Sequence, residues 1–398
     1  MSTFRLSRFF SQPEILRGID PENLLSILAD HAEVLAALGL PLPDVAASGL
    51  DYGALMQLLM EPDKLPGKLR EAFYFVHEMA TPEGMDFLVE AAANARPPVE
   101  IIGNPGPTPG DVACQVWLKA PELMERTHAE RFLQNVRSFK SFGASAWPVP
   151  RHHDPMAVAA LMKKDLDDFF EKKKRGRNTK VFPYMREDGV WFLVRHGDPF
   201  KREGAIDDKG ESYGAYYWPE KFDVVVFNTT DGELRINARN KGELNEYQKV
   251  FGRYLCGDEH FFTVDTKYTL EPLRSVGADS VAPIEGMDHV YLTEAHFLWT
   301  EPKCERVTYK SPDDLFSVHA ETGRKFPEGP AIVKACFRIK FTDSPAPRTV
   351  AITLPNEAQY MRDADSVLVE KWLRVRGFIV AKGKGQYAPA VEKILVSA

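Results

Sequence analysis

The sequence predicts an α+β protein: an all-helical N-terminal domain followed by a mixed, largely antiparallel-sheet α+β domain. Two observations carry this prediction. Apolar residues recur at helical spacing through the first 145 residues, and alternating, aromatic-rich segments separated by turn residues follow from residue 180. Short turns between successive strands favour antiparallel pairing, because parallel strands need a longer crossover.

Helix starts are marked by a capping residue followed by proline. The capping oxygen satisfies a free N–H of the first turn, and proline at the first helical position gives up no hydrogen bond inside the helix. Five such pairs predict five helix starts: Asp20-Pro21, Thr81-Pro82, Thr108-Pro109, Asp154-Pro155 and Ser311-Pro312.

The predicted domains follow from this change of pattern. Residues 1–145 form the helical domain, and residues 146–179 form a connector and a linking helix with a basic end. Residues 180–398 form the α+β sheet domain, which can divide again near residue 300. Two turn signals within it, Glu187-Asp188-Gly189 and Asp231-Gly232, predict hairpins.

Composition narrows the class of protein. An apolar share of 44% and a charged share of 27% are typical of a globular protein. A net charge of −7 argues against a general nucleic-acid coat, and no apolar run reaches the ~20 residues of a membrane span. Because the four cysteines are far apart, we expect reduced thiols in a cytoplasmic protein rather than a metal site or disulfides.

A first candidate site is Arg195-His196-Gly197, which follows an apolar run. It resembles the opening signature of the histidine phosphatases, in which the histidine accepts the phosphoryl group and the arginine holds the phosphate. The resemblance covers residues 193–197, and Asp198 follows where that family has Glu or Gln. The alternative, which we favour, is a half-buried strand that ends in a turn, with Arg195 and His196 at its solvent end.

A second candidate site loosely resembles the PD-(D/E)xK nucleases, whose paired acids hold Mg²⁺. The matching residues are Asp223, Glu233 and Arg235, with arginine in place of the lysine that activates water. A two-residue turn at Asp231-Gly232 would pair Thr230 with Glu233. Asp223 and Glu233 would then lie on opposite faces, so we favour a hairpin without metal.

A third candidate is a basic run at the end of the linking helix, where six of the ten residues 171–180 are Lys or Arg. A solvated helix end is the favoured interpretation, since the helix dipole attracts cations there. Phosphate binding, as in a nucleic-acid site, is the alternative. The candidate residues for that role are Lys172, Lys173, Lys174, Arg175 and Arg177.

Two further features concern histidines and aromatic residues. His289 and His296 are seven positions apart in a predicted strand, so we expect them on opposite faces and without a shared metal. Tyr216, Tyr217 and Trp218 are consecutive, so they cannot all point inward from a strand. At least one ring needs cover from another element, a partner or a stacked base.

Together these patterns favour a non-catalytic cytoplasmic protein that binds a macromolecular partner as an accessory or adaptor subunit. The partner is a protein or a nucleic acid, and no membrane is expected. Two enzymatic alternatives stay open: a Mg²⁺-dependent phosphodiesterase at Asp223 and Glu233, and a phosphohydrolase at His196. No cofactor is predicted, and Mg²⁺ is needed only in the phosphodiesterase alternative.

Overall fold

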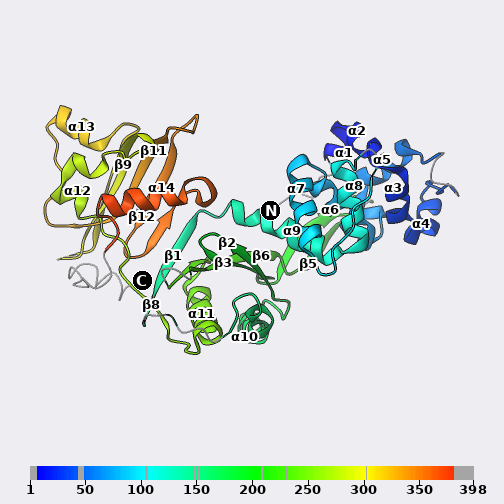
Figure 1. Cartoon of the computed structure of the whole chain (residues 1–398), viewed down its shortest axis with the longest axis horizontal. Coiled ribbons are helices and arrows are strands. Elements are labelled where there is room, and N and C mark those ends of the chain that lie inside the picture. The colour runs from blue at the N-terminus through cyan, green and yellow to red at the C-terminus, as the bar shows by residue number, and fades with distance from the viewer. Residues whose placement is uncertain are drawn as a thin grey trace. The chain divides into compact units, whose positions relative to one another are not determined.

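The computed structural model describes residues 7–43, 49–103, 106–146, 149, 153–207, 209–228, 232–301 and 303–380 of the chain. Residue contacts divide the chain into two units, Met1–Phe132 and Leu133–Ala398 (Figure 1). In the described residues, helices make up the N-terminal part and a largely antiparallel sheet with helices follows. The predicted α+β fold class is therefore confirmed.

The first unit is built from helices around one apolar core. That core includes Leu24, Phe73, Val76 and Val112, which are all buried. The helical elements are α1 (Ser7–Ser11), α2 (Pro13–Arg17), α3 (Pro21–Leu28), η1 (Ala29–His31), α4 (Ala32–Ala37), α5 (Tyr52–Met60), η2 (Pro62–Lys64), α6 (Gly67–Met79), α7 (Pro82–Asn94), α8 (Pro109–Lys119) and α9 (Pro121–Gln134), the last of which crosses the boundary between the units.

Three of the five predicted helix starts are confirmed by their caps. The side chains of Asp20, Thr81 and Thr108 accept hydrogen bonds from the first turns of α3, α7 and α8. The other two are wrong by three residues each. Asp154 and Ser311 instead accept from backbone N–H groups two residues ahead, in turns that precede the helices.

The second unit contains an eleven-stranded sheet in which every recorded pair of strands is antiparallel. Its order is β10-β9-β11-β12-β13-β1-β7-β6-β3-β2, and β8 also pairs with β1. The strands are β1 (Ser138–Ala144), β2 (Lys180–Arg186), β3 (Gly189–Gly197), β6 (Glu220–Asn228), β7 (Glu233–Asn237), β8 (Phe262–Val264), β9 (Met287–Trp299), β10 (Glu305–Lys310), β11 (Ala331–Phe341), β12 (Arg348–Thr353) and β13 (Glu357–Gln359).

Strands β4 (Lys201–Ile206) and β5 (Ser212–Tyr217) form a separate two-stranded sheet, the β4–β5 hairpin. It is inserted between β3 and β6, which pair with each other in the large sheet. The remaining helical elements of the second unit are α10 (Val158–Lys172), α11 (Lys241–Phe251), η3 (Gly252–Cys256), α12 (Pro272–Ser275), η4 (Gly277–Val281), α13 (Leu315–Thr322) and α14 (Arg362–Val375).

The large sheet carries two apolar cores on opposite faces. Helices α10 and α11 pack on the face that presents Phe142 and Leu234, whereas α14 packs on the face that presents Ala358 and Ile352. The register shows the change of face, because Ala358 pairs with Phe139, and Phe139 points away from the face of Phe142. Because helices cover both faces of the sheet, polar side chains on either face of the central strands can be buried.

Strand β1 lies within residues 1–145, which the sequence assigned to the helical domain. Ser138–Ala144 precede that boundary, yet β1 pairs with β7, β8 and β13 of the second unit. The contact-based division falls earlier, after Phe132.

Among the helices in the described part of the chain, none combines the length and apolar composition of a membrane span.

Candidate functional site

His196 lies near the end of β3 and is almost completely buried. Alternation along β3 places it on the same face as Val194, beneath α10. Its ring stacks on Phe170 of α10, with the ring centroids 3.9 Å apart and the planes 12° apart. The expectation that His196 lies at the solvent end of the strand is therefore wrong, because α10 covers this face up to the last residues of β3.

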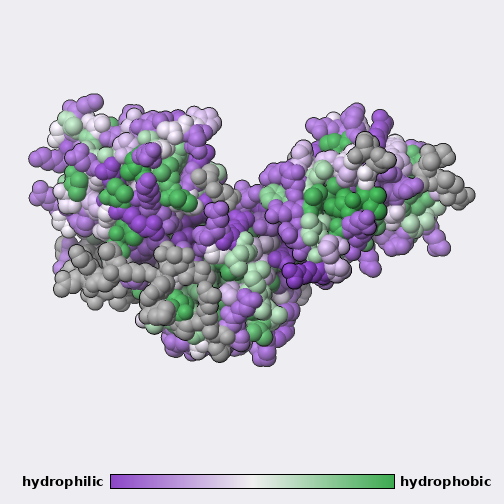
Figure 2. Space-filling model, in the orientation of Figure 1, coloured by the Kyte–Doolittle hydropathy of each residue, from purple (hydrophilic) through white to green (hydrophobic). Residues whose placement is uncertain are grey.

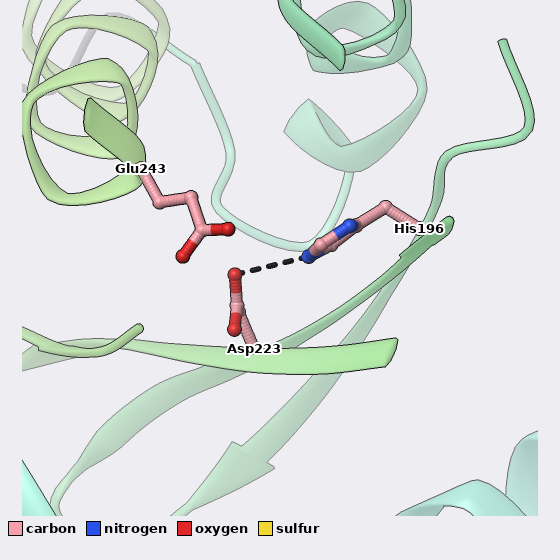
Figure 3. Close-up of side chains that lie close together, drawn as sticks. All are labelled: His196, Asp223 and Glu243. Carbon is pink, nitrogen blue, oxygen red and sulfur yellow. Dashed lines mark hydrogen bonds and ion pairs between the residues drawn. The ribbon is translucent and has the colours of Figure 1, made fainter. Parts of the chain in front are cut away.

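Asp223 on β6 is the acceptor at the centre of this buried group (Figure 3). Its Oδ2 atom lies 3.0 Å from His196 Nε2, and it accepts a hydrogen bond of 2.9 Å from the hydroxyl of Tyr247 on α11. Its other oxygen lies 3.3 Å from the ammonium of Lys221 on the same strand. Three donors from three elements thus satisfy one buried carboxylate, as burial of a charge requires.

Both ring nitrogens of His196 face acceptors. Nδ1 lies 2.8 Å from the carbonyl oxygen of Gly197, and Nε2 faces the Asp223 carboxylate. Each ring nitrogen thus has an oxygen atom of the protein within hydrogen-bonding distance. A phosphohydrolase nucleophile needs a ring nitrogen that is open to the substrate, and in this arrangement both nitrogens are engaged inside the protein.

Glu243 on α11 completes the group. It is the third residue of the helix and closes a capping box with Asn240, so its position follows from how α11 begins. Its carboxylate also accepts from Arg175 at 2.5 Å and from Lys221 at 3.1 Å. Burial would raise the pKa of Glu243, but the hydrogen bond from Arg175 and the charge of Lys221 hold that pKa below its ordinary value.

The side chains of His196, Asp223 and Glu243 each offer an atom that could ligate a metal, and these atoms lie within 4.8 Å of one another. The ammonium of Lys221, however, contacts both carboxylates and so takes the place between them that a cation would need. Arg175 adds a second positive charge at Glu243. The donor set therefore fits an internal ion-pair network better than a metal centre.

The network joins cations and carboxylates in one buried group. Arg175 and Lys221 supply the cations, Asp223, Glu243 and Asp198 supply the carboxylates, and His196 contacts Asp223. Burial, followed by the Asp223 carboxylate, raises the pKa of Tyr247 well above its ordinary value, so this tyrosine stays a neutral donor. We call these seven residues the His196 network.

The second candidate pair, Asp223 and Glu233, lies on opposite faces of the sheet. Asn228 pairs with Glu233, so Asp223 shares its face with Leu234 rather than with Glu233. The register differs by two positions from a pairing of Thr230 with Glu233, and Thr230 and Asp231 themselves lie outside the described residues. A shift of two preserves each side chain's face, and the two carboxylates cannot share a metal.

Glu233 and Arg235 belong to a second buried network, which we call the Glu233 network. Glu233 accepts from Arg235 at 2.9 Å and from Lys267 at 2.7 Å, and Arg235 lies 3.1 Å from Glu370 of α14. Although burial raises the pKa of Glu233, the charges of Lys267 and Arg235 lower it to about 2. Arg235 also contacts Asp188 in the β2–β3 turn. The positive charge of Arg235 is thus paired with carboxylates within the protein.

The basic run at the end of α10 separates into three groups. Arg175 points inward to Glu243, and Arg177 pairs with Asp168 and Glu171 on the surface. Lys172, Lys173 and Lys174 are exposed, and none of them forms an ion pair with a carboxylate of the described residues. Of the five predicted phosphate-binding candidates, these three lysines present their charges outward. Arg195, the neighbour of His196, is half-buried and lies 3.5 Å from Glu220.

Exposed aromatic rings gather on the β4–β5 hairpin and its flanks. Of the six exposed aromatic side chains in the described part of the chain, four lie between residues 200 and 218. They are Phe200 (51% exposed), Tyr213 (52%), Tyr216 (61%) and Trp218 (49%). Figure 2 shows hydrophobic patches elsewhere on the surface too, so what distinguishes the hairpin is the concentration of aromatic rings.

Several residues of the two networks were not among the sequence-based candidates: Lys221, Glu243, Tyr247, Lys267 and Glu370. Glu243 has a sequence signal, because Asn240 precedes it by three positions in the spacing of a capping box. Tyr247 and Lys267 carry no local signal, since their partners Asp223 and Glu233 lie 24 and 34 residues away. No protein-family model matches the chain, and no curated protein matches it significantly in sequence.

Proposed function

We propose that this protein is a non-catalytic accessory subunit that binds a macromolecular partner through the β4–β5 hairpin and its flanks. The observation that carries the proposal is the gathering of four exposed aromatic side chains within residues 200–218. Aromatic residues are enriched at protein interfaces, where their large faces are covered on binding. A hairpin outside the large sheet can be inserted into a partner without disturbing either core.

The interactions of the candidate catalytic residues also support a binding role. His196 and Asp223 hydrogen-bond to each other inside the His196 network, and Glu233 and Arg235 form an ion pair inside the Glu233 network. Side chains that neutralise one another in the interior stabilise a specific arrangement, and catalysis needs groups that meet a substrate. Neither enzymatic alternative therefore gains support from an observation of its own.

We also propose that the protein acts in the cytoplasm. Its four cysteines are free, and two of them, Cys114 and Cys256, are buried. Burial raises the pKa of Cys256 to about 12, so its thiol stays protonated and unreactive. Free thiols of this kind suit a reducing compartment, and fractionation of the native cell with an antibody to the protein tests the location.

The proposal is tested by affinity capture from the cell that makes the protein. The hairpin variant Phe200→Ser/Tyr216→Ser is compared with wild type and with the control variant Met60→Ser/Met185→Ser. Both control methionines are 65% exposed, and they lie outside the hairpin. We expect a partner that the wild type and the control retain and the hairpin variant loses. Equal capture by all three proteins would contradict a binding role for the hairpin.

A further inference from the structure

The aromatic base of the hairpin lies directly beside the basic end of α10. The indole Nε1 of Trp218 donates a hydrogen bond to the carbonyl oxygen of Lys174, with the atoms 3.4 Å apart. Gly197 lies beneath this contact. A side chain there would approach the carbonyl oxygen of Arg175 to 2.4 Å and Trp218 to 3.4 Å. Segments more than 40 residues apart in sequence thus form one continuous surface.

Three rings form the aromatic part of this surface. The ring centroids of Phe200 and Trp218 are 4.7 Å apart, and those of Phe200 and Tyr216 are 6.1 Å apart with the planes inclined by 18°. About half or more of each side chain is exposed. The rings contact one another in two pairs, and this exposed area is accessible to a further planar group.

Two paired glycines lie on the hairpin face beyond Tyr216. Gly204 pairs directly with Gly214 on the same face as Tyr216, and nothing lies within 4 Å of the place where a side chain on Gly204 would begin. Arg202 pairs with Tyr216 across the hairpin and is exposed. A side chain on Gly214 would meet Arg202 Nε at 2.8 Å and a ring carbon of Tyr216 at 3.0 Å, so these two side chains lie over Gly214, whereas the backbone at Gly204 is open to the close approach of an extended chain.

Four exposed cations, Lys172, Lys173, Lys174 and Arg202, flank the rings. Acids beside them lie near other cations: Asp198 is 3.8 Å from Arg175, Glu220 is 3.5 Å from Arg195, and Glu203 pairs with Lys201. The three outward-facing lysines of the α10 end, together with Arg202, are surplus to these pairs. Such a local positive potential persists in a protein of net charge −7, because it acts over roughly a Debye length, about 8 Å at physiological salt.

We propose that this surface binds single-stranded nucleic acid, RNA or DNA, with unpaired bases stacked on the Phe200–Tyr216–Trp218 rings and phosphates at Lys172, Lys173, Lys174 and Arg202. The inference rests on the proposed function and names its partner. Exposed aromatic rings beside a row of cations are the chemistry of sequence-tolerant single-strand binding. A duplex suits the surface less well, because its bases are already stacked on one another. A protein partner with a purely apolar surface also suits this surface less well, because it would offer the lysines no negative charges.

Binding is measured by fluorescence anisotropy with 5′-labelled (dT)20 and (rU)20, and with a (dA)20·(dT)20 duplex, at two salt concentrations. The aromatic variant is Phe200→Ser/Tyr216→Ser. The charge variant is Lys172→Glu/Lys173→Glu/Lys174→Glu. The controls are Met60→Ser/Met185→Ser, and a charge reversal of three exposed cations outside the surface, Lys303→Glu/Arg324→Glu/Lys325→Glu. Circular dichroism and thermal unfolding establish that each variant is folded.

We expect the wild type and both controls to bind the single strands more tightly than the duplex. Losing two stacking rings weakens single-strand binding by about tenfold or more. Each phosphate neutralised contributes about 0.7 to the slope of log K against log salt, so the charge variant lowers that slope by about two. Adding Arg202→Gln to the charge variant lowers the salt slope by less than one more and leaves the stacking of bases on the rings unchanged.

Three outcomes would overturn the inference. One is the absence of wild-type binding to either oligonucleotide at about 100 µM protein and low salt, where even non-specific binding is measurable. Another is binding that the aromatic and charge variants leave unchanged. The third is a protein partner that wild type captures through the hairpin while neither oligonucleotide binds. This third outcome retains the proposed function, whereas a hairpin that binds neither protein nor nucleic acid removes both.

Discussion

The carboxylates of Asp223 and Glu233 lie on opposite faces of one sheet, although the two residues are only ten positions apart on neighbouring strands. Asp223 is held by His196, Tyr247 and Lys221 beneath α10 and α11. Glu233 is held by Lys267 and Arg235 on the face of α14. The sheet itself separates two buried charge networks, and this separation has measurable consequences.

The first prediction is that the two networks contribute independently to stability. Asp223→Asn and Glu233→Gln each remove a buried charge and leave cations without their partner, so each should lower the free energy of unfolding by about 3 kcal/mol. Because the networks share no residue, the effects in the double variant should add to within about 0.5 kcal/mol. Urea denaturation of the four proteins measures this. A coupling above about 1 kcal/mol would show that the networks communicate through the sheet.

The second prediction contrasts neighbours on β3. His196→Ala removes a hydrogen-bond partner of Asp223 and a ring stacked on Phe170, and should lower the free energy of unfolding by about 3 kcal/mol or more. Arg195→Gln changes a half-buried side chain whose carboxylate partner is mostly exposed, and should cost less than about 1 kcal/mol. Thermal and urea unfolding compare them. Equal losses would be inconsistent with the burial of His196.

The third prediction concerns acid. The pKa of Glu233 is lowered to about 2 in the folded protein, so the unfolded chain takes up a proton on this residue first as the pH falls. The stability that Glu233 contributes is therefore complete above about pH 5 and is lost as the pH falls toward 2. Over this window wild type should lose about 3 kcal/mol more than Glu233→Gln, in which this group cannot titrate.

The measurement is the free energy of unfolding of both proteins at several pH values from 7 downward. Carboxylates with lowered pKa values outside the Glu233 network, such as Glu243, titrate in both proteins and cancel in the difference. Parallel curves for the two proteins would mean that Glu233 has an ordinary pKa in the folded state.

The fourth prediction separates the members of the basic run. Arg175→Gln leaves the buried Glu243 carboxylate with one cation fewer and should lower the free energy of unfolding by about 2–3 kcal/mol. Lys172→Gln alters an exposed helix end and should change it by less than about 0.5 kcal/mol. If denaturation gave Lys172→Gln the larger effect, the inward position of Arg175 would be refuted.

Local sequence signals predicted those parts of the fold that depend on neighbours in the chain. The caps at Asp20, Thr81 and Thr108 predicted helix starts, because a cap is a contact between residues two or three positions apart. Turn residues at Glu187-Asp188 predicted the hairpin that pairs Arg186 with Gly189. Alternation also placed Asp223 and Glu233 on opposite faces, since a shift in register by two leaves the faces unchanged.

A β-bulge shows where alternation alone fails. His289 and His296, seven positions apart, were expected on opposite faces of their strand. In β9 the register shifts at Thr293, because Leu292 pairs with Phe337 while Glu294 pairs with Cys336. The extra residue brings both histidines to the same face, paired with Lys340 and Lys334 respectively. The residue types around Thr293 gave no sequence signal for this bulge.

The sequence by itself determined that a helical part precedes a largely antiparallel sheet with helices, and it placed three helix starts and the turn between β2 and β3, because these depend on spacing within a few residues. Only the tertiary structure decided what the polar residues do. His196 is buried because α10 covers the end of β3, and Lys174 meets Trp218 because an inserted hairpin returns to the end of that helix. Such contacts join residues dozens of positions apart, and their energy depends on packing and burial that no short segment of sequence contains.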